Sequence, residues 1–187
     1  KGIKRTFYLL ILMLAIAVLV YGCHLGAPAY KGPRSQHFDG KRFHNLAPYS
    51  KKSFWDILKW RVSRKDPRWP EWVENKKYSD PDKRFNHIGK VAVTFINHAT
   101  VLLQIDGVNI LTDPHWSQRA SPVSWTGPKR IRSPGVSFEK LPKIDIVLIS
   151  HNHYDHLDLD TLLKLRKKFH PVFIVGLGND LYLKKHG

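Results

Sequence analysis

The sequence contains little cysteine and little acid. Its single cysteine, Cys23, permits no internal disulfide, so cysteine pairing does not reveal the redox compartment. Asp and Glu number 15 against 31 Lys and Arg, which gives a formal net charge of +16 at pH 7. General disorder is excluded, because 42% of the residues are apolar and 12% are aromatic. With 187 residues and no visible repeat, the chain can build one domain with a substantial core.

A long apolar run is also missing. The run from Phe7 to Tyr21 is shorter than the ~20 residues that a membrane span needs, and it follows a basic amino terminus, as in a signal peptide. Val20-Tyr21-Gly22-Cys23 resembles a bacterial lipobox, in which the cysteine is lipidated. Residues 1–23 therefore indicate a lipoprotein signal, an uncleaved anchor or an ordinary signal peptide. Each places the protein at a membrane or beyond it, and we expect it to be membrane-associated in a bacterial cell envelope.

Residues 24–88 form a basic lead-in. Lys and Arg outnumber acids between positions 51 and 90, where four tryptophans are interleaved: Trp55, Trp60, Trp69 and Trp72. Such a surface suits anionic lipid headgroups, and it also suits nucleic acid. The third interpretation is a solvated basic face over a core that contains the tryptophans. Ser53 and Asp56 form a capping-box pattern, so we expect a short amphipathic helix that ends before Pro67 and docks on the domain.

Residues 89–187 have the pattern of a layered α/β domain. Strands are expected at 91–96, 101–105 and 108–111, with Asp106-Gly107 as a hairpin turn. A long loop follows from 116 to 142. The nearly unbroken apolar runs at 144–149 and 171–175 predict strands buried on both faces, and a helix at 159–169 would join them into a βαβ unit. A last helix is expected around 180–185.

The chemistry is concentrated in four residues that follow the strand at 144–149: His151, His153, Asp155 and His156. The carboxyl ends of strands are where α/β folds place their sites. Residues two apart in an extended chain point the same way, so His151 and His153 can bind one metal, and Asp155 and His156 would face a neighbouring one. Imidazole with carboxylate is a zinc ligand set. Two zinc ions about 3.5–4 Å apart would share a hydroxide that acts as the nucleophile.

The pattern His151-x-His153-x-Asp155-His156 resembles the metal motif of the metallo-β-lactamase superfamily. The stretch from Val91 onward is similar to the branch of phospholipases D that hydrolyse N-acylphosphatidylethanolamine, and to its bacterial relatives. The segments that carry this second resemblance are 94–100, 109–114, 119–122, 127–130 and 150–158.

The resemblance implies an αββα sandwich of which this chain contains only the first half. It implies that His151 and His153 bind one zinc, that Asp155 and His156 bind the other, and that Asp155 is the proton shuttle. The family completes its site with another His, a bridging Asp and a final His. The chain begins with Lys1 and reaches Gly187 before any of them, so we expect a fragment that holds metal weakly and has little activity.

Three further residues are candidates for supporting roles. His98 leaves the first strand and would line the pocket, unless it is a packed loop histidine. Asp113 would hydrogen-bond a ligand histidine, although an Asp-Pro turn explains it nearly as well. Asp158 is expected to cap the helix at 159–169, with orientation of a ligand imidazole as the alternative.

We therefore expect a binuclear, metal-dependent phosphodiesterase of phospholipase D type that acts on N-acylated phosphatidylethanolamine-like lipids at a membrane. The alternatives are a lactonase or sugar-phosphate esterase with the same metals, a nuclease, against which the export signals argue, and a non-catalytic envelope protein if the natural chain ends at Gly187.

Overall fold

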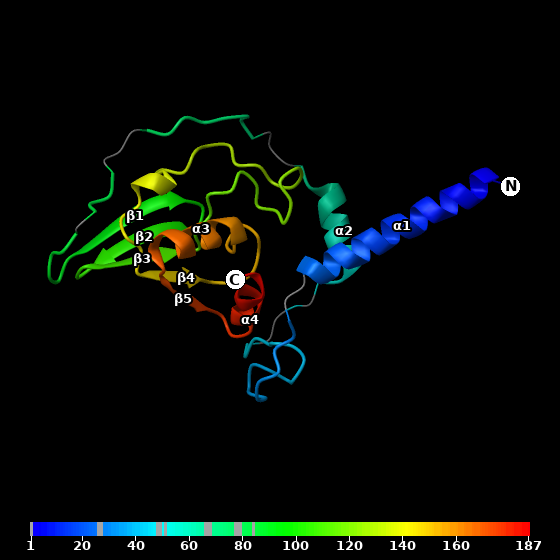
Figure 1. Ribbon diagram of the computed structural model, residues 1–187, viewed down its shortest axis with the longest axis horizontal. Coiled ribbons are helices and arrows are strands. Elements are labelled where there is room, and N and C mark those ends of the chain that lie inside the picture. The colour runs from blue at the N-terminus through cyan, green and yellow to red at the C-terminus, as the bar shows by residue number, and fades with distance from the viewer. Residues whose placement is uncertain are drawn as a thin grey trace.

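The computed structural model consists of a mixed α/β domain preceded by a lead-in and an amino-terminal helix (Figure 1). The structure describes residues 2–25, 28–47, 50, 52–65, 69–76, 80–83 and 85–187. Within the amino-terminal helix, side chains are described only from Thr6 to Ala17. The expected lipidation of Cys23 therefore lies outside the described side chains and stays a prediction.

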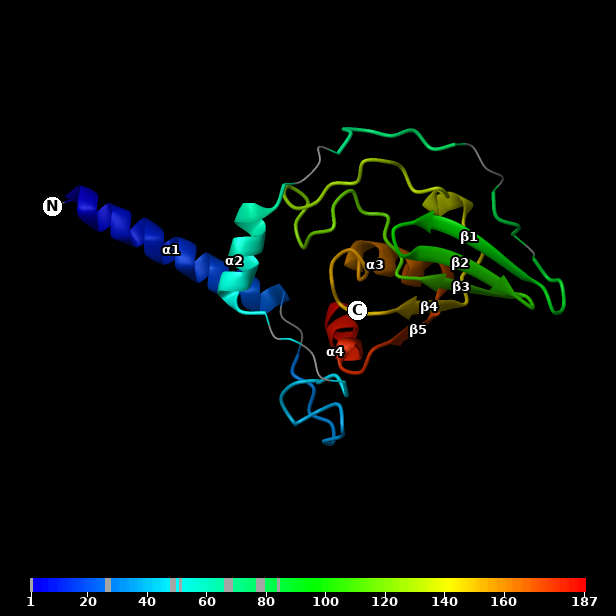
Figure 2. The same ribbon diagram turned by 180° about the vertical axis from the view of Figure 1, so that it is seen from behind.

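Two helices precede the domain, α1 (Gly2–Leu25) and α2 (Phe54–Ser63), and both views show them away from the sheet (Figures 1 and 2). Among the described residues, no helix combines the length and the apolar character needed to cross a membrane. α2 begins as predicted: Ser53 accepts a hydrogen bond from the amide of Asp56, whose carboxylate accepts one from the amide of Ser53. This reciprocal pair satisfies two amides that the first turn leaves unpaired.

The predicted docking of α2 on the domain is wrong, because α2 contains no buried residue. Trp55 is 73% exposed and Val62 is 79% exposed. The tryptophans of the lead-in do not belong to a core either, since Trp69 and Trp72 are 74% and 45% exposed. The pattern of the sequence revealed an apolar stripe but could not reveal whether another element would cover it.

The domain contains a five-stranded sheet in the order β1-β2-β3-β4-β5. Its antiparallel part is β1 (Val91–Asn97), β2 (Thr100–Ile105) and β3 (Val108–Thr112), and its parallel part adds β4 (Ile146–Ile149) and β5 (Val172–Val175). The helices α3 (Leu159–Phe169) and α4 (Asn179–His186) follow β4 and β5, and a short 3-10 helix, η1 (Phe138–Lys140), lies in the long loop. The predicted turn at Asp106-Gly107 is confirmed, with φ of 47° and 80°.

One face of the sheet carries the core. Leu102 pairs with Leu111, which pairs with Val147, and all three are fully buried. Leu162 and Leu165 of α3 join them in one cluster. The α3 leucines recur at helical spacing, so a single face of this helix meets the alternating face of the strands. This packing fixes the carboxyl end of β4 relative to the start of α3.

The opposite face of the sheet is apolar and accessible. The register places Val93, Leu103, Ile110, Ile146 and Val172 side by side across all five strands. Val93 is 66% exposed and Val172 is 64% exposed. The expectation that β4 and β5 are buried on both faces is therefore wrong for the described residues, because alternate residues of β5 are exposed and those of β4 half-buried.

The lead-in is joined to the edge of the domain. The amide of Val73 donates to the carbonyl of Ile131, and the side chain of Gln104 donates to the carbonyl of Asp82. Asp80 forms an ion pair with Lys140 at 2.9 Å. Figure 2 shows this part of the lead-in as an arc outside the long loop. The lead-in thus contributes to the periphery of the domain that the sequence assigned to residues 89–187.

We predict that two neighbouring leucines of β2 differ in their effect on stability. Leu102→Ala should lower the free energy of unfolding of the 187-residue chain by about 2–5 kcal/mol, because it empties part of a packed core. Leu103→Ala is the matched control on the accessible face and should cost about 1 kcal/mol or less. Urea denaturation of both variants gives the comparison, and equal costs would contradict the assignment of the two faces.

Candidate metal centre

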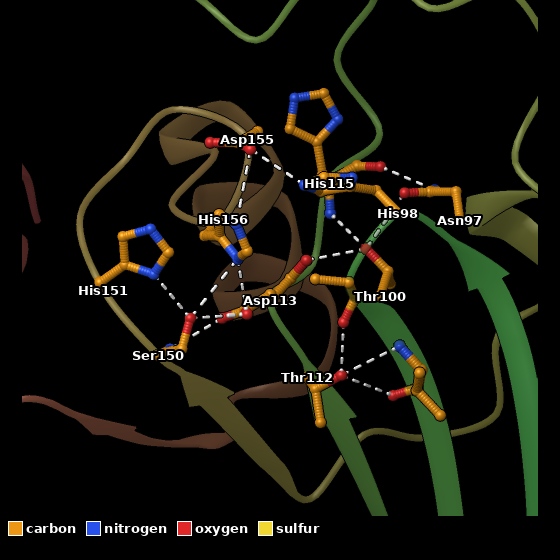
Figure 3. A network of polar contacts seen from close by, with 12 residues as sticks. Asn97, His98, Thr100, Thr112, Asp113, His115, Ser150, His151, Asp155 and His156 are labelled. Carbon is orange, nitrogen blue, oxygen red and sulfur yellow. Dashed lines mark hydrogen bonds and ion pairs between the residues drawn. The ribbon is translucent and has the colours of Figure 1, made fainter.

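The candidate site lies at the carboxyl edge of the parallel strands. β4 ends at Ile149, the segment from Ser150 to Asp158 follows, and α3 begins at Leu159. The loop after β3 and the turn between β1 and β2 reach the same edge (Figure 3). Three separate parts of the chain therefore supply side chains to one place, as expected for strands whose ends share an edge.

The imidazoles of the motif lie close together. The ring centroids of His151 and His153 are 4.6 Å apart, and those of His151 and His156 are 4.1 Å apart. Nε2 of His156 is 3.4 Å from Oδ2 of Asp155. A turn at positions 153–157, closed by the Leu157 amide donating to the His153 carbonyl, brings Asp155 and His156 back beside the two earlier histidines.

His98 reaches this cluster from the turn between β1 and β2. Its Nε2 lies 2.9 Å from Oδ2 of Asp155, and its ring centroid is 5.1 Å from that of His156. The backbone of His98 has φ of 39°, in the left-handed region that few residues other than glycine adopt. The sequence suggested a pocket residue, and the structure places His98 in direct contact with a residue of the motif.

Asp113 holds His156 in place. Its Oδ2 lies 2.8 Å from Nδ1 of His156, while the amide and hydroxyl of Ser150 donate to its two oxygens at 2.7 Å each. The carboxylate is buried, and φ of Asp113 is 35°. The hydrogen bond to His156 leaves Nε2 as the nitrogen of that ring which faces the cluster.

A network of hydroxyls and amides joins these two turns. The hydroxyl of Thr100, which is fully buried, donates to the carbonyl of Asp113 at 2.7 Å. The side-chain amide of Asn97 donates to the carbonyl of His115, and the hydroxyl of Thr112 donates to the carbonyl of Ala99 (Figure 3). Each of these bonds satisfies a backbone group that strand pairing leaves free at the sheet edge. The turn that carries His98 is thereby fixed relative to Asp113.

Asp158 caps α3, as predicted. Its carboxylate accepts hydrogen bonds from the amide and hydroxyl of Thr161, and from the amides of Trp116 and Ser117 and the hydroxyl of Ser117. Burial alone would raise the pKa of this carboxyl, but the bonds from Thr161 and Ser117 and the charge of His115 outweigh it and hold the pKa below its usual value. Within the described residues, these bonds connect Asp158 to the long loop and not to a ligand imidazole.

Arg130 stabilises the long loop from inside. Its guanidinium donates to the carbonyls of His115 and Ser117, and it lies 3.1 Å from Nδ1 of His115. Burial lowers the pKa of His115; the carboxylate of Asp158 acts against this, and the charge of Arg130 acts with it. None of Ser150, Ser117 and Arg130 is evident as a site residue from the sequence alone. Ser150 lies directly before the motif and Arg130 lies in segment 127–130, whereas Ser117 lies in none of the segments that carry the resemblance.

The residues present fit a divalent metal. One ligand atom each from His98, Asp155 and His156 lies within 4.8 Å of the others. Burial opposes ionisation of Asp155, but a backbone hydrogen bond, the charge of His156 and the bond to His98 outweigh it, so the pKa of the carboxyl lies below its ordinary value. Imidazole nitrogens and a carboxylate held in the ionised form are ligands for zinc, iron and manganese alike.

Residues 108–187 match the family model described as the Beta-lactamase superfamily domain. This segment begins at β3 and contains Asp113 and the complete motif from His151 to His156. The match therefore covers residues 108–187, and the resemblance read from the motif is confirmed for this region. The mixed α/β fold with a five-stranded sheet agrees with it.

Curated relatives match over about half of the chain. An uncharacterized protein of Mycobacterium tuberculosis is 46% identical over 98 residues, which cover 52% of this chain and 26% of that protein. The N-acyl-phosphatidylethanolamine-hydrolyzing phospholipase D 1 of Caenorhabditis elegans is 42% identical over 95 residues, 50% of this chain and 27% of that protein. A UPF0173 metal-dependent hydrolase of Anaeromyxobacter is 37% identical over 94 residues, 50% of this chain and 30% of that protein.

These matches therefore span between 26% and 30% of the length of the three relatives. Among solved structures, a metallo hydrolase from the archaeon Ignicoccus hospitalis is similar, with a TM-score of 0.38 and 27% identity. The similarity covers 52% of this chain and 36% of that one.

We predict that Asp158→Ala destabilises the fold by at least about 3 kcal/mol, because the helix loses its cap and buried amides of the long loop lose their acceptor. Asp160→Ala is the matched control in the same turn of α3. Asp160 is exposed, so its replacement should change the free energy of unfolding by about 0.5 kcal/mol or less.

The cost of Asp158→Ala should also depend on pH. Because the folded-state pKa of Asp158 is depressed, the stabilisation is present above its unfolded pKa of about 3.9 and is lost as the pH falls through the folded pKa. Urea denaturation at neutral pH and in acid measures this. If the free energies of unfolding of wild type and variant differ by the same amount down to the lowest accessible pH, Asp158 does not cap the helix as an ionised carboxylate.

Proposed function

We propose that this chain is part of a metal-dependent phosphodiesterase of phospholipase D type, acting on N-acylated phosphatidylethanolamine-like lipids. The observation that carries the proposal is the gathering of His98, His151, His153, Asp155 and His156 at the carboxyl edge of β4. The similarity to the nematode phospholipase D supports the lipid substrate, and the similarity to the Anaeromyxobacter protein supports metal-dependent hydrolysis.

In this proposal His151 and His153 hold one metal, and Asp155 and His156 hold the other, with zinc as the expected ion. Two bound divalent metals would lower the pKa of water into the neutral range and polarise the phosphoryl oxygens. Asp155 is ionised near neutral pH, so its Oδ2 can accept the proton of the attacking water and pass it to the leaving oxygen. His98, bonded to that same oxygen, keeps the carboxylate aimed at the cluster.

The substrate reaction breaks the bond between phosphorus and the oxygen of the N-acylethanolamine group. Water supplies the hydroxyl that phosphorus gains, and the departing oxygen takes the proton, so the products are phosphatidic acid and an N-acylethanolamine. This chemistry needs no serine or cysteine nucleophile. It agrees with a cluster in which imidazoles and a carboxylate are the residues that converge.

We predict that His153→Ala abolishes the release of phosphatidic acid from vesicles that contain N-acylphosphatidylethanolamine, measured with the full-length, metal-loaded protein. Asp155→Asn keeps the size of the side chain but removes the proton acceptor and should lower kcat by about 10²–10⁴-fold. His37→Ala, which removes an exposed histidine of the lead-in, is the control and should leave the rate unchanged.

Undiminished turnover in both site variants would refute the proposed mechanism. The same preparations should be assayed with lactones and sugar-phosphate esters. Metal-dependent turnover of one of these, without release of phosphatidic acid, would keep the metal centre and replace the lipid substrate.

The lead-in supports association with a membrane surface. Phe54, Trp55 and Trp60 are exposed on α2, and Lys59, Arg61 and Arg64 are interleaved with them, the last with its guanidinium 4.8 Å from the Trp60 ring. Aromatic rings favour the interface of a bilayer, and basic residues favour anionic headgroups. We therefore propose that α2 lies on the surface of an anionic membrane, as in a bacterial envelope, with α1 beside it.

We predict that anionic vesicles slow amide hydrogen exchange in α2. An exposed helix of ten residues is marginal in water, so its amides should exchange fast until lipid covers it. With the full-length protein on phosphatidylglycerol vesicles, exchange at 54–63 should be at least ~10-fold slower than on phosphatidylcholine vesicles. The double variant Trp55→Ser/Trp60→Ser should lose this protection, whereas exchange at 131–137 should not respond. Equal rates on both vesicles would exclude α2 as the contact.

A further inference from the structure

Ser150 joins the two ends of a hydrogen-bonded chain at the candidate site. Its hydroxyl oxygen lies 2.7 Å from Oδ2 of Asp113 and 2.9 Å from Nδ1 of His151. The same oxygen of Asp113 lies 2.8 Å from Nδ1 of His156. One carboxylate is thus connected to two imidazoles of the motif, directly in one case and through a hydroxyl in the other (Figure 3).

The hydrogen atoms in this chain can be assigned by counting. A carboxylate only accepts, so His156 must carry its hydrogen on Nδ1 and donate it to Asp113. The Ser150 hydroxyl has a single hydrogen, and the bond to the carboxylate is the shorter and charge-assisted one. With that hydrogen directed at Asp113, the Ser150 oxygen is left as an acceptor towards His151. His151 must then carry its hydrogen on Nδ1 as well.

From this count we propose that Ser150 is a positioning residue that sets the tautomer of His151. Because the Ser150 hydroxyl donates its hydrogen to the Asp113 carboxylate, its oxygen is left to accept a hydrogen from His151. The inference rests on the proposed metal-binding function, because its consequence is that both rings present an unprotonated Nε2 for a metal. Among the described residues, the Ser150 hydroxyl is the group that hydrogen-bonds a ring nitrogen of His151. Without it, a share of the His151 rings would present a hydrogen where a lone pair is needed.

Asp113, where this series of hydrogen bonds begins, is held rigidly enough to fix the tautomer of His151. The amide of Asp113 donates to the carbonyl of Leu148 at 2.8 Å, and the carbonyl of Asp113 accepts from the Thr100 hydroxyl. The amide of Ser150 donates to the second carboxylate oxygen. The Asp113 side chain is 9% exposed, so turning the carboxylate away from its donors would leave a buried charge unpaired. Its direction is therefore fixed by β3, β4 and the β1–β2 turn together.

The test is to observe the tautomers in the metal-free full-length protein by ¹⁵N-detected NMR of the imidazoles, at a pH where the spectra show both rings to be neutral. His151 and His156 should both carry the hydrogen on Nδ1. In Ser150→Ala, His151 should lose this preference while His156, bonded directly to Asp113, keeps it. Ser150→Thr retains the hydroxyl and should restore the wild-type pattern at His151.

The zinc dissociation constant of the same proteins gives the second measurement. Ser150→Ala should weaken zinc binding by about 10–100-fold, and Ser150→Thr should recover most of the loss. A wild-type His151 with its hydrogen on Nε2 overturns the proposal, whether or not the alanine variant folds. So does an unchanged tautomer of His151 in Ser150→Ala. These outcomes are independent of turnover, so they remain distinct from a failure of the proposed phosphodiesterase activity.

Discussion

The site depends on the buried carboxylate of Asp113. This group lies at the end of β3 and accepts hydrogen bonds from Ser150, immediately after β4, and from His156, beyond the turn of the motif. It therefore joins two parallel strands at the edge where their backbone pairing ends. An unpaired buried carboxylate is costly, so Asp113 must keep its hydrogen-bond donors. The same hydrogen bonds therefore position the motif and join the two strands at the sheet edge. The left-handed backbone at Asp113 is tolerated because three elements hold it.

Asp158 has the corresponding role on the other side of the motif. It caps α3 and accepts hydrogen bonds from the loop that follows Asp113, while Arg130 donates to the carbonyls of the same loop. The residues from His151 to His156 thus lie between two buried carboxylates, each anchored to a different segment. This explains how an exposed loop can hold several imidazoles close together without a packed core of its own.

Much of the fold could be predicted from the sequence, because its signals are local. The turn at Asp106-Gly107, the cap of α3 and the strand–helix–strand order depend on short-range patterns, and all are confirmed. The failures concern burial, which depends on distant partners. The apolar stripe of α2 and the alternate residues of β5 are accessible. In the site, the motif was evident from spacing, whereas the contacts of His98 and Ser150 depend on which turns meet at the sheet edge.

The turn that carries His98 has a consequence for the order in which the molecule is assembled. The contact of His98 with Asp155 joins residues 57 positions apart, and that of Asp113 with His156 joins residues 43 apart. Closing such loops costs chain entropy, and the contacts that offset this cost form only when the intervening strands have paired. The group of His98, Asp155 and His156 is therefore a late product of folding. A peptide with the motif alone would contain ligands but no preorganised site, so a metal ion would meet the finished geometry only after the sheet has formed.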